Sequence, residues 1–325
     1  MQNKIIAITT IHEKSQAIKE FEKIPGWSII IAGDNNSEPI DNSSKCRFIS
    51  FDEQGQSDFE LNRMMPAGHY CRKNAAYLEA ISNCAEIIYD SDDDNFPKPN
   101  WKTPDFNCSK ILRGSKFINI YQMFTHEHAW PRGFPLDEIN TAVNVQSEFE
   151  NSKIAVWQSL ADGDPDLDAI YRLTSGKSVE FENTQPFALD RGCYSPINSQ
   201  ATFWNNNVFE LLYLPATVSM RFSDILRGLV AQRLMWEKDL RAGFMHAVVY
   251  QERNDHDLMK DFKDEIDCYL NVKKIVDLLD KTDFDNDLKD NLLQAYEILG
   301  ENGFTGNEEP HYVRAWIDDL NRIGR

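Results

Sequence analysis

Four carboxylates lie within five positions of the sequence, at Asp90, Asp92, Asp93 and Asp94, directly after the mainly apolar segment 86–89. Carboxylates this close repel one another, so the cluster costs stability unless a positive charge lies among them. Mg²⁺ or Mn²⁺ takes oxygen ligands, keeps open coordination positions and bridges to phosphate oxygens. Alternate side chains of an extended segment share a face, which would place Asp92 and Asp94 together. The cluster predicts a divalent-cation site; the alternative is a solvated acidic loop.

The elements around this cluster are those of an α/β fold. Short apolar runs alternate with helical stretches, which indicates a βαβ unit and a parallel sheet. The predicted strands are residues 4–8, 27–32, 47–51, 86–89 and 244–250, and the main predicted helices are 72–85 and 224–236, the latter with Ser223 as its N-cap. Between 101 and 200 the pattern indicates short strands and long polar loops. Ligands of open α/β sheets bind at the carboxyl ends of strands, which is where the acidic cluster falls.

Composition excludes several classes of protein. The chain has 325 residues, of which 42% are hydrophobic, so it can build a core and is not disordered. Its 34 Lys and Arg against 52 Asp and Glu give a net charge of -18, which disfavours nucleic acid and anionic lipid as partners. No apolar run approaches the roughly 20 residues of a membrane helix, and the start of the sequence is not a signal peptide. The six cysteines form no C-x-x-C pair, which predicts free thiols in the cytoplasm.

The end of the chain differs in charge from the rest. Residues 251–325 hold 19 acidic and 10 basic residues, a net of -9 and half of the total. Their apolar residues recur with helical periodicity. We therefore expect a domain over 1–256 and an acidic helical appendage over 257–325. Three candidate roles for this appendage are homo-oligomer formation, binding of a protein partner and capping of the sheet.

Several segments resemble known glycosyltransferases. The helix that begins with CRKN and the following EIIYDSDDDN are similar to the nucleotide-binding half of a GT-A glycosyltransferase, where a D-x-D motif holds the metal that binds the donor diphosphate. WPRGFPLD (130–137), YSPINSQATFW (194–204) and LPATVSMRFSDILRGLVAQRLMWE (214–237) resemble the STELLO group. Parts of 92–96, 132–135 and 221–224 are more distantly similar to reversibly glycosylated polypeptides, the plant UDP-arabinopyranose mutases. Plant STELLO proteins carry a membrane anchor that this sequence lacks, so we expect a soluble relative.

The resemblance implies roles for the acidic residues. In the mutase register the metal motif is Asp92, Asp93 and Asp94, and in the general D-x-D register it is Asp90 and Asp92. Asp92 belongs to both and is the strongest candidate ligand. His256 follows the last predicted strand, where GT-A enzymes often supply a further ligand; the alternative is a histidine of the tail with no such role. The His126-x-His128 pair is a weaker metal signal.

Nucleotide contacts are expected at the ends of the first two strands. In the GT-A fold the positions of Thr9, Thr10 and Asp34 touch the base and ribose, the alternative being ordinary turn chemistry. Arg72 and Lys73 begin the helix before the acidic strand, where cations could neutralise diphosphate. The alternative for this pair is a salt bridge to the acidic turn.

The other candidate residues lie in the later segments. In the mutases the arginine matching Arg132 becomes reversibly glycosylated; simpler roles are a fixed cation over the donor or a structural ion pair. Asp224 begins a predicted helix, where the helix dipole favours its ionised form but weakens it as a base. GT-A enzymes often place the acceptor-activating base at such a helix start, so Asp224 is the candidate base, and the alternative is a helix residue without chemistry. Arg227 could orient Asp224 or bind phosphate.

Sugar contacts are expected in the loop 194–204. Asn198 and Gln200 are uncharged hydrogen-bonding groups, and Trp204 offers a flat aromatic face, as sugar sites often do. The alternative is a turn with a tryptophan in the core. Together the patterns predict a metal-dependent glycosyltransferase that moves a sugar from a nucleoside-diphosphate sugar, UDP-sugar by default, to a glycan or other hydroxyl acceptor. The alternatives are a sugar-nucleotide mutase and a non-catalytic scaffold of the same fold.

Overall fold

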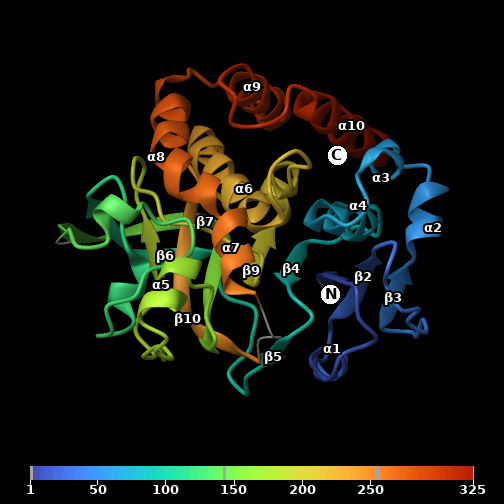
Figure 1. Ribbon diagram of the computed structural model, residues 1–325, viewed down its shortest axis with the longest axis horizontal. Coiled ribbons are helices and arrows are strands. Elements are labelled where there is room, and N and C mark those ends of the chain that lie inside the picture. Colours follow the sequence, from blue (N-terminus) through green and yellow to red (C-terminus); the bar gives the residue numbers. More distant parts are fainter. Residues whose placement is uncertain (1–2, 142–143, 253–256, 325) are drawn as a thin grey trace.

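The computed structural model describes residues 3–141, 144–252 and 257–324, and a mixed ten-stranded sheet runs through it (Figure 1). The strand order is β3-β2-β1-β4-β9-β7-β6-β8-β10-β5. The strands are β1 (Lys4–Thr10), β2 (Ser28–Gly33), β3 (Cys46–Ile49), β4 (Ile87–Ser91), β5 (Asn95–Pro97), β6 (Asn107–Gly114), β7 (Val145–Gly163), β8 (Phe187–Leu189), β9 (Ala201–Asn205) and β10 (Arg241–Gln251). The α/β class and the mixed sheet with flanking helices are therefore confirmed.

Helices cover the sheet and form the end of the chain. They are α1 (Gln16–Phe21), α2 (Phe51–Gly55), α3 (Glu60–Met64), α4 (Asn74–Ser82), α5 (Ala169–Thr174), α6 (Met220–Met235), α7 (Leu258–Asp264), α8 (Ile266–Lys281), α9 (Leu288–Glu301) and α10 (Glu309–Ile323). A 3-10 turn, η1 (Tyr70–Lys73), leads directly into α4. None of the described helices is both long and apolar enough to cross a bilayer.

The first part of the sheet is parallel and brings three strand ends together. β1 lies between β2 and β4 and runs parallel to both, and β2 runs parallel to β3. The apolar run at the centre of β1 is buried on both faces, as in other parallel sheets. β1 ends at Thr10, β2 at Gly33 and β4 at Ser91, so the residues that follow these three strands meet at one edge.

Three local expectations differ from the structure. The predicted helix 224–236 begins four residues earlier, at Met220, with Ser219 at the N-cap position. Ser223 is therefore a buried residue of the first turn, and its hydroxyl donates to the Pro215 carbonyl at 2.9 Å. Within 101–200, β7 is a single strand of 19 residues, not the short strand expected there. The third strand ends at Ile49, because the Ser50 side chain caps α2.

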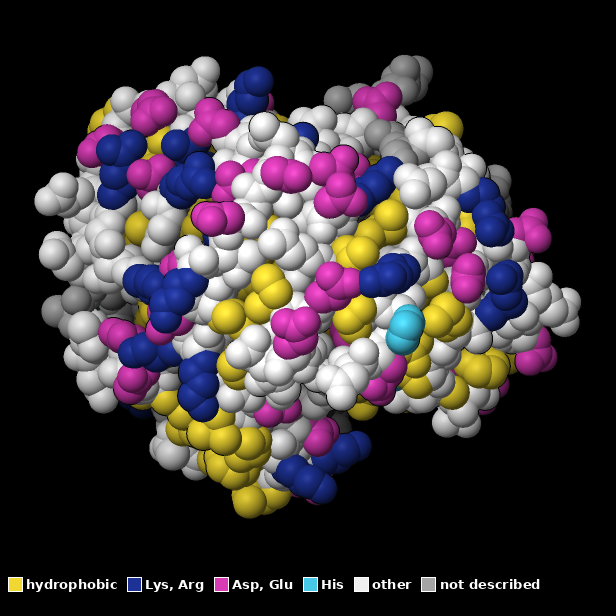
Figure 2. Space-filling view, turned by 90° about the horizontal axis from the view of Figure 1, so that it is seen from above, with side chains coloured by type: hydrophobic (Ala, Val, Ile, Leu, Met, Phe, Trp, Pro, Cys, Tyr) yellow, Lys and Arg dark blue, Asp and Glu magenta, His cyan; other side chains and the backbone are white. Residues whose placement is uncertain are grey.

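The C-terminal helices pack into the same core as the sheet. Apolar residues of α8, α9 and α10, such as Ile275, Leu292 and Trp316, belong to one buried cluster with Leu78 of α4 and Leu226 of α6. α8 and α9 lie on α6, and α10 lies against α3 and α4, so these helices arch over the top of the molecule in Figure 1. Seen from above, acidic and basic side chains are interspersed over this face (Figure 2). The tail is thus packed on the α/β fold by its apolar side.

Candidate active site

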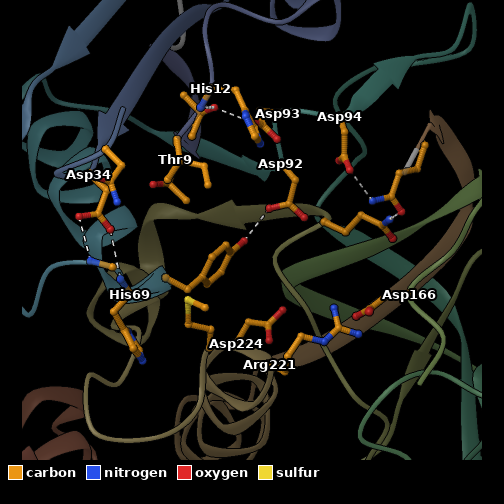
Figure 3. A pocket seen from close by; sticks show the side chains of 18 of the residues that line it. Thr9, His12, Asp34, His69, Asp92, Asp93, Asp94, Asp166, Arg221 and Asp224 are labelled. Atoms are coloured by element: carbon orange, nitrogen blue, oxygen red, sulfur yellow. Dashed lines mark hydrogen bonds between the residues drawn. The ribbon is translucent and has the colours of Figure 1, made fainter. Parts of the chain in front are cut away.

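A cavity of about 440 Å³ lies where the ends of β1, β2 and β4 meet (Figure 3). One wall is formed by residues 9–12, 34–36 and 68–70, and the floor includes residues 92–94. The opposite wall carries Met220, Arg221 and Asp224 of α6, together with Arg132 and Asp166. Gln200 and Gln251 complete the lining. The cavity therefore lies at the carboxyl end of β4, where the acidic cluster falls.

The three consecutive carboxylates of the cavity diverge to different partners. Asp92 Oδ1 accepts a hydrogen bond of 2.6 Å from the Tyr70 hydroxyl. The Thr10 hydroxyl donates to Asp93, and Gln251 Nε2 donates to Asp94 Oδ2 at 2.9 Å. The chain turns at Asp93 and Asp94, so the alternation of an extended strand, on which Asp92 and Asp94 were expected to share a face, does not apply. All three side chains nevertheless line the cavity.

Charge is only partly balanced around these carboxylates. Lys73 Nζ lies 2.6 Å from Asp90 Oδ1 and 3.4 Å from Asp92 Oδ1, and Arg227 lies 2.8 Å from Asp90 Oδ2. The described residues place no cation in an ion pair with Asp93 or Asp94, whose partners are a hydroxyl and an amide. Two negative charges are left uncompensated by these contacts, which matches the charge of one divalent cation.

Burial makes the acidic turn costly in its charged form. Burial raises the pKa of Asp92 to about 6, and burial together with the nearby Asp92 charge raises the pKa of Asp94 to about 7. Within the described ranges, Asp94 Oδ1 is buried and has no hydrogen-bond partner. A carboxylate oxygen in this state is suited to a hard cation, so the residues present fit Mg²⁺ or Mn²⁺.

Protein ligands alone do not complete a metal site in the described part of the chain. There, no three His, Cys, Asp or Glu side chains converge closely enough to hold an ion. Mg²⁺ commonly keeps several waters and is bound through one or two carboxylates together with substrate phosphates. His256 lies outside the described residues. His126 is exposed at 3.5 Å from Glu182, and His128 packs on Trp130, so neither faces the cavity.

The residues expected to contact the nucleotide form hydrogen bonds mainly with other parts of the protein. The Asp34 carboxylate accepts from the amides of Asn35, Gly68 and His69 at 2.7–3.1 Å, which fixes the loop 68–70 against the end of β2. The Thr9 hydroxyl donates to the Ala32 carbonyl at 2.9 Å. These two residues and Thr10 line the cavity as expected, but their side chains serve the turn chemistry that was the alternative.

Arg72 and Lys73 do not reach the cavity, contrary to expectation. The Arg72 side chain is buried and donates to the backbone carbonyls of Asn62 and Met65 and to the side-chain oxygen of Gln54. Lys73 is fully buried beneath the acidic turn, in the salt bridge that was its alternative reading. Asp90 is likewise fully buried between Lys73 and Arg227 and does not line the cavity. Arg72 and Lys73 belong to η1, which directs both side chains into the core, whereas Asp90 is a buried residue of β4.

Arg132 is enclosed by two carboxylates. Its Nε and Nη2 each lie 2.8 Å from an oxygen of Asp166, and its Nη1 and Nη2 lie 3.0 and 2.9 Å from the oxygens of Asp224. Although burial opposes both shifts, this pairing lowers the pKa of Asp166 and holds the pKa of Arg132 well above its ordinary value. All three guanidinium nitrogens donate to carboxylates, which is the arrangement of the structural ion pair that was one of the alternatives for Arg132.

Asp224 lines the cavity but is poorly suited to act as a base. Besides the two contacts from Arg132, its oxygens accept from the amides of Ser199 at 3.1 Å and Ile225 at 2.9 Å. Four donors occupy about all the lone-pair positions of a carboxylate. The expectation that Asp224 removes the acceptor proton is therefore not supported by its contacts.

Of the four expected substrate contacts, only Gln200 reaches the cavity. Trp204 is fully buried in β9 beneath the Arg227 guanidinium, as in its alternative reading. Arg227 is buried against Asp90 and Tyr77 and does not contact Asp224. Asn198 donates to Asp166 at 2.8 Å behind the cavity wall. Gln200 lies in the lining and donates to Gln251.

Comparison with known proteins agrees with the family suggested by the sequence. Residues 221–325 match the profile of the STELLO glycosyltransferases. Two proteins of Arabidopsis thaliana, the probable glycosyltransferases STELLO2 and STELLO1, are 27% and 28% identical to this chain, each over 99% of its length. This chain is similar to the STELLO glycosyltransferases. It spans less than half of these relatives, 45% of STELLO2 and 44% of STELLO1.

Solved structures resemble the chain more distantly. Glucosyl-3-phosphoglycerate synthase from Mycobacterium tuberculosis, in complex with Mn²⁺, UDP and phosphoglyceric acid, has a TM-score of 0.42 and 13% identity over 83% of this chain and 78% of that chain. The same enzyme with phosphoglyceric acid has a TM-score of 0.41 and 11% identity over 86% of this chain and 78% of that chain.

Sequence reasoning missed several residues of the cavity. Tyr70, Asp166 and Gln251 line it, but each lies in a segment in which no chemical pattern was recognised. Arg221 also lines it and lies in the segment 214–237, whose resemblance to the STELLO group was noted, but it was given no role. Asn35 and Asn36 carried a usable signal, because polar residues directly follow Asp34 at the end of a parallel strand. Arg221 Nη2 lies 2.5 Å from Glu265, which ties the start of α6 to the C-terminal helices.

Proposed function

We propose that this chain is a glycosyltransferase that uses a nucleoside-diphosphate sugar together with Mg²⁺ or Mn²⁺. The observation that carries the proposal is the pair of carboxylates, Asp93 and Asp94, that enter the cavity beside Asp92 without a described cation to balance them. A divalent cation bound through these residues would be neutralised further by a diphosphate. The similarity to the STELLO glycosyltransferases supports transfer of a sugar as the reaction.

The cavity offers separate places for the parts of the donor. The loops after β1 and β2, with Asn35 and Asn36, would hold the nucleoside next to the acidic turn. The sugar would then lie between Gln200, Gln251 and the start of α6, where a hydroxyl acceptor can also enter. When bound, the cation supplies stabilisation of the negative charge that develops on the leaving diphosphate. UDP-sugar is the default donor, and a glycan or a small molecule is the acceptor class.

The ion pairs of the opposite wall would keep the reacting groups in position. Asp224 and Asp166 hold Arg132 from two sides, and Asn198 donates to Asp166, so this wall has few rotatable parts. The polar groups of a rigid wall reorganise little when charge develops in the transition state. Such preorganisation accounts for much of the rate enhancement of many enzymes. We assign these residues to positioning and not to covalent chemistry.

A thermal-shift panel of UDP, GDP, CDP, ADP and dTDP, each with and without Mn²⁺, tests the proposal. A ligand that binds only the folded state stabilises it by RT ln(1 + [L]/Kd), about 2.7 kcal/mol at a hundredfold excess over Kd. We expect one nucleotide to raise the melting temperature only with Mn²⁺, and Asp92→Asn to abolish that shift. Asp318→Asn, the same change at an exposed aspartate of α10, should leave it intact. No shift with any nucleotide would contradict the proposal and favour a non-catalytic scaffold.

A further inference from the structure

Tyr70 is the only tyrosine among the described residues that line the cavity, and it connects the acidic turn with Lys73. Its hydroxyl oxygen lies 2.6 Å from Asp92 Oδ1 and 3.0 Å from Lys73 Nζ. A lysine ammonium can only donate and a carboxylate can only accept. The Tyr70 oxygen therefore accepts from Lys73, and its proton is donated to Asp92.

Both contacts act on the same oxygen of Asp92. Lys73 Nζ approaches Oδ1 at 3.4 Å, and Tyr70 donates to Oδ1 as well. No contact from a described residue engages Oδ2, and the Asp92 side chain is 31% exposed. Figure 3 shows the Asp92 carboxylate directed into the cavity with this hydrogen bond on one side. One oxygen is thus held by the protein and the other is presented to the cavity.

Lys73 is itself fixed from behind. Its side chain is completely buried, and its ammonium lies 2.6 Å from Asp90, which in turn pairs with Arg227 of α6. The charges along Asp92, Lys73, Asp90 and Arg227 alternate in sign. Moving Lys73 toward a bound phosphate would leave Asp90 without one of its two partners, so Lys73 stays in place as a support.

We propose that Tyr70 and Lys73 are positioning residues that orient the Asp92 carboxylate so that its free oxygen binds the divalent cation. The inference rests on the proposed function, because it concerns the cation of that site. Residues that hydrogen-bond to a metal ligand fix its orientation, and their loss typically weakens metal binding about 10- to 100-fold. Tyr70 acts through its hydroxyl group. Tyr70→Phe removes this hydroxyl and keeps the ring, so the variant tests the hydroxyl alone.

Tyr77 provides a matched control for the same chemical change. It is fully buried one helical turn into α4, and its hydroxyl lies 3.0 Å from Arg227 Nη1, so it contacts the same chain of charges. It neither contacts Asp92 nor lines the cavity. If the hydroxyl of Tyr70 served only general stability, the two Tyr→Phe variants would behave alike in metal binding.

Titration of the full chain with Mn²⁺ alone, followed by electron paramagnetic resonance of free Mn²⁺, measures the effect. We expect Tyr70→Phe to weaken the dissociation constant about 10- to 100-fold and Tyr77→Phe to leave it within about twofold of the unchanged protein. In an Asp92→Asn background, Tyr70→Phe should cause no further loss, because the hydroxyl acts through Asp92. The melting temperature of each metal-free variant shows that it is folded.

The outcomes separate this inference from the function on which it rests. The titration is repeated with the nucleotide that raises the melting temperature in the panel. If the unchanged protein binds Mn²⁺ neither alone nor with that nucleotide, the cation site of the proposed function and the role of Tyr70 both fail. If the unchanged protein binds Mn²⁺ and Tyr70→Phe binds it as tightly, only the positioning role is overturned. A loss that persists in full in the Asp92→Asn background would also overturn it, because the effect would then not pass through Asp92.

Discussion

At the scale of residues, the cavity is lined and supported from beneath by buried charges whose partners are themselves charged. Arg132 lies between Asp166 and Asp224, and Lys73 lies between Asp90 and Asp92. A buried ion loses its hydration, so each of these groups depends on its neighbours to remain charged. The acidic turn departs from this rule, since Asp93 and Asp94 have only neutral described partners, and this departure marks the candidate cation site.

Arg132 gives a prediction that separates a structural from a reactive role. The variant Arg132→Met leaves the carboxylates of Asp166 and Asp224 buried, close together and without their shared counter-ion. We therefore expect a loss of about 3–5 kcal/mol in the free energy of unfolding. Arg191→Met, which removes an exposed arginine paired with Glu237 at 2.8 Å, should cost about 1 kcal/mol or less. Urea unfolding followed by circular dichroism measures both. A variant of Arg132 with unchanged stability but no turnover would support the reactive arginine of a mutase instead.

At the scale of elements, the wall of the cavity depends on where α6 begins. Residues 215–217 precede α6 and are held by Glu309 at the start of α10. The Glu309 carboxylate accepts from the Tyr213 hydroxyl at 2.5 Å, from the amides of Ala216 and Thr217 at 3.0 and 2.8 Å, and from the Thr217 hydroxyl at 2.5 Å. A C-terminal helix thus sets the position of the segment that carries Met220, Arg221 and Asp224.

Glu309→Gln tests this connection between α10 and α6. All four groups around the carboxylate are donors, so the amide nitrogen of glutamine would face another donor and leave it unpaired. We expect a loss of about 2 kcal/mol or more in the free energy of unfolding, because these are charge-assisted hydrogen bonds in a buried site. Glu308→Gln, the same change at the exposed neighbour, should alter stability by less than about 0.5 kcal/mol. Equal effects of the two variants in chemical denaturation would argue against the connection.

At the scale of the whole molecule, the helices after residue 256 are part of the fold. Trp316 and Leu292 are fully or almost fully buried, and Asp319 of α10 accepts from the amides of Glu60 and Leu61 at the start of α3. The α3 helix has no capping side chain of its own, so α10 supplies that contact. The tail carries charge on its exposed side and core residues on the other.

Removal of 257–325 is therefore expected to unfold the remainder. The fragment 1–256 would expose the apolar faces of α4 and α6 that α8, α9 and α10 cover. We expect it to aggregate or to be degraded rapidly in limited proteolysis, where the full chain resists. A soluble 1–256 fragment with a cooperative thermal transition would show instead that the tail is a separate unit, as the change in charge along the sequence predicts.

Local patterns were sufficient to predict five of the ten described strands (β1, β2, β3, β4 and β10), the parallel βα arrangement and the place of the acidic turn. Apolar runs and strand ends are properties of neighbouring residues, and the carboxyl ends of parallel strands collect ligands wherever they occur. This is why the cavity lies at the strand end where the acidic cluster falls. The resemblance to STELLO proteins likewise depended on short segments in a fixed order.

Partners distant in the chain were decided only by the tertiary structure. Asp34 holds the amides of Gly68 and His69, Lys73 turns inward to Asp90, and Arg132 joins Asp224, which lies 92 positions away. The sequence alone does not distinguish a charged residue that faces the ligand from one that faces a buried counter-ion. Which of the two it meets depends on the direction of its side chain within the packed fold, because a buried charge must find a partner and an exposed one need not.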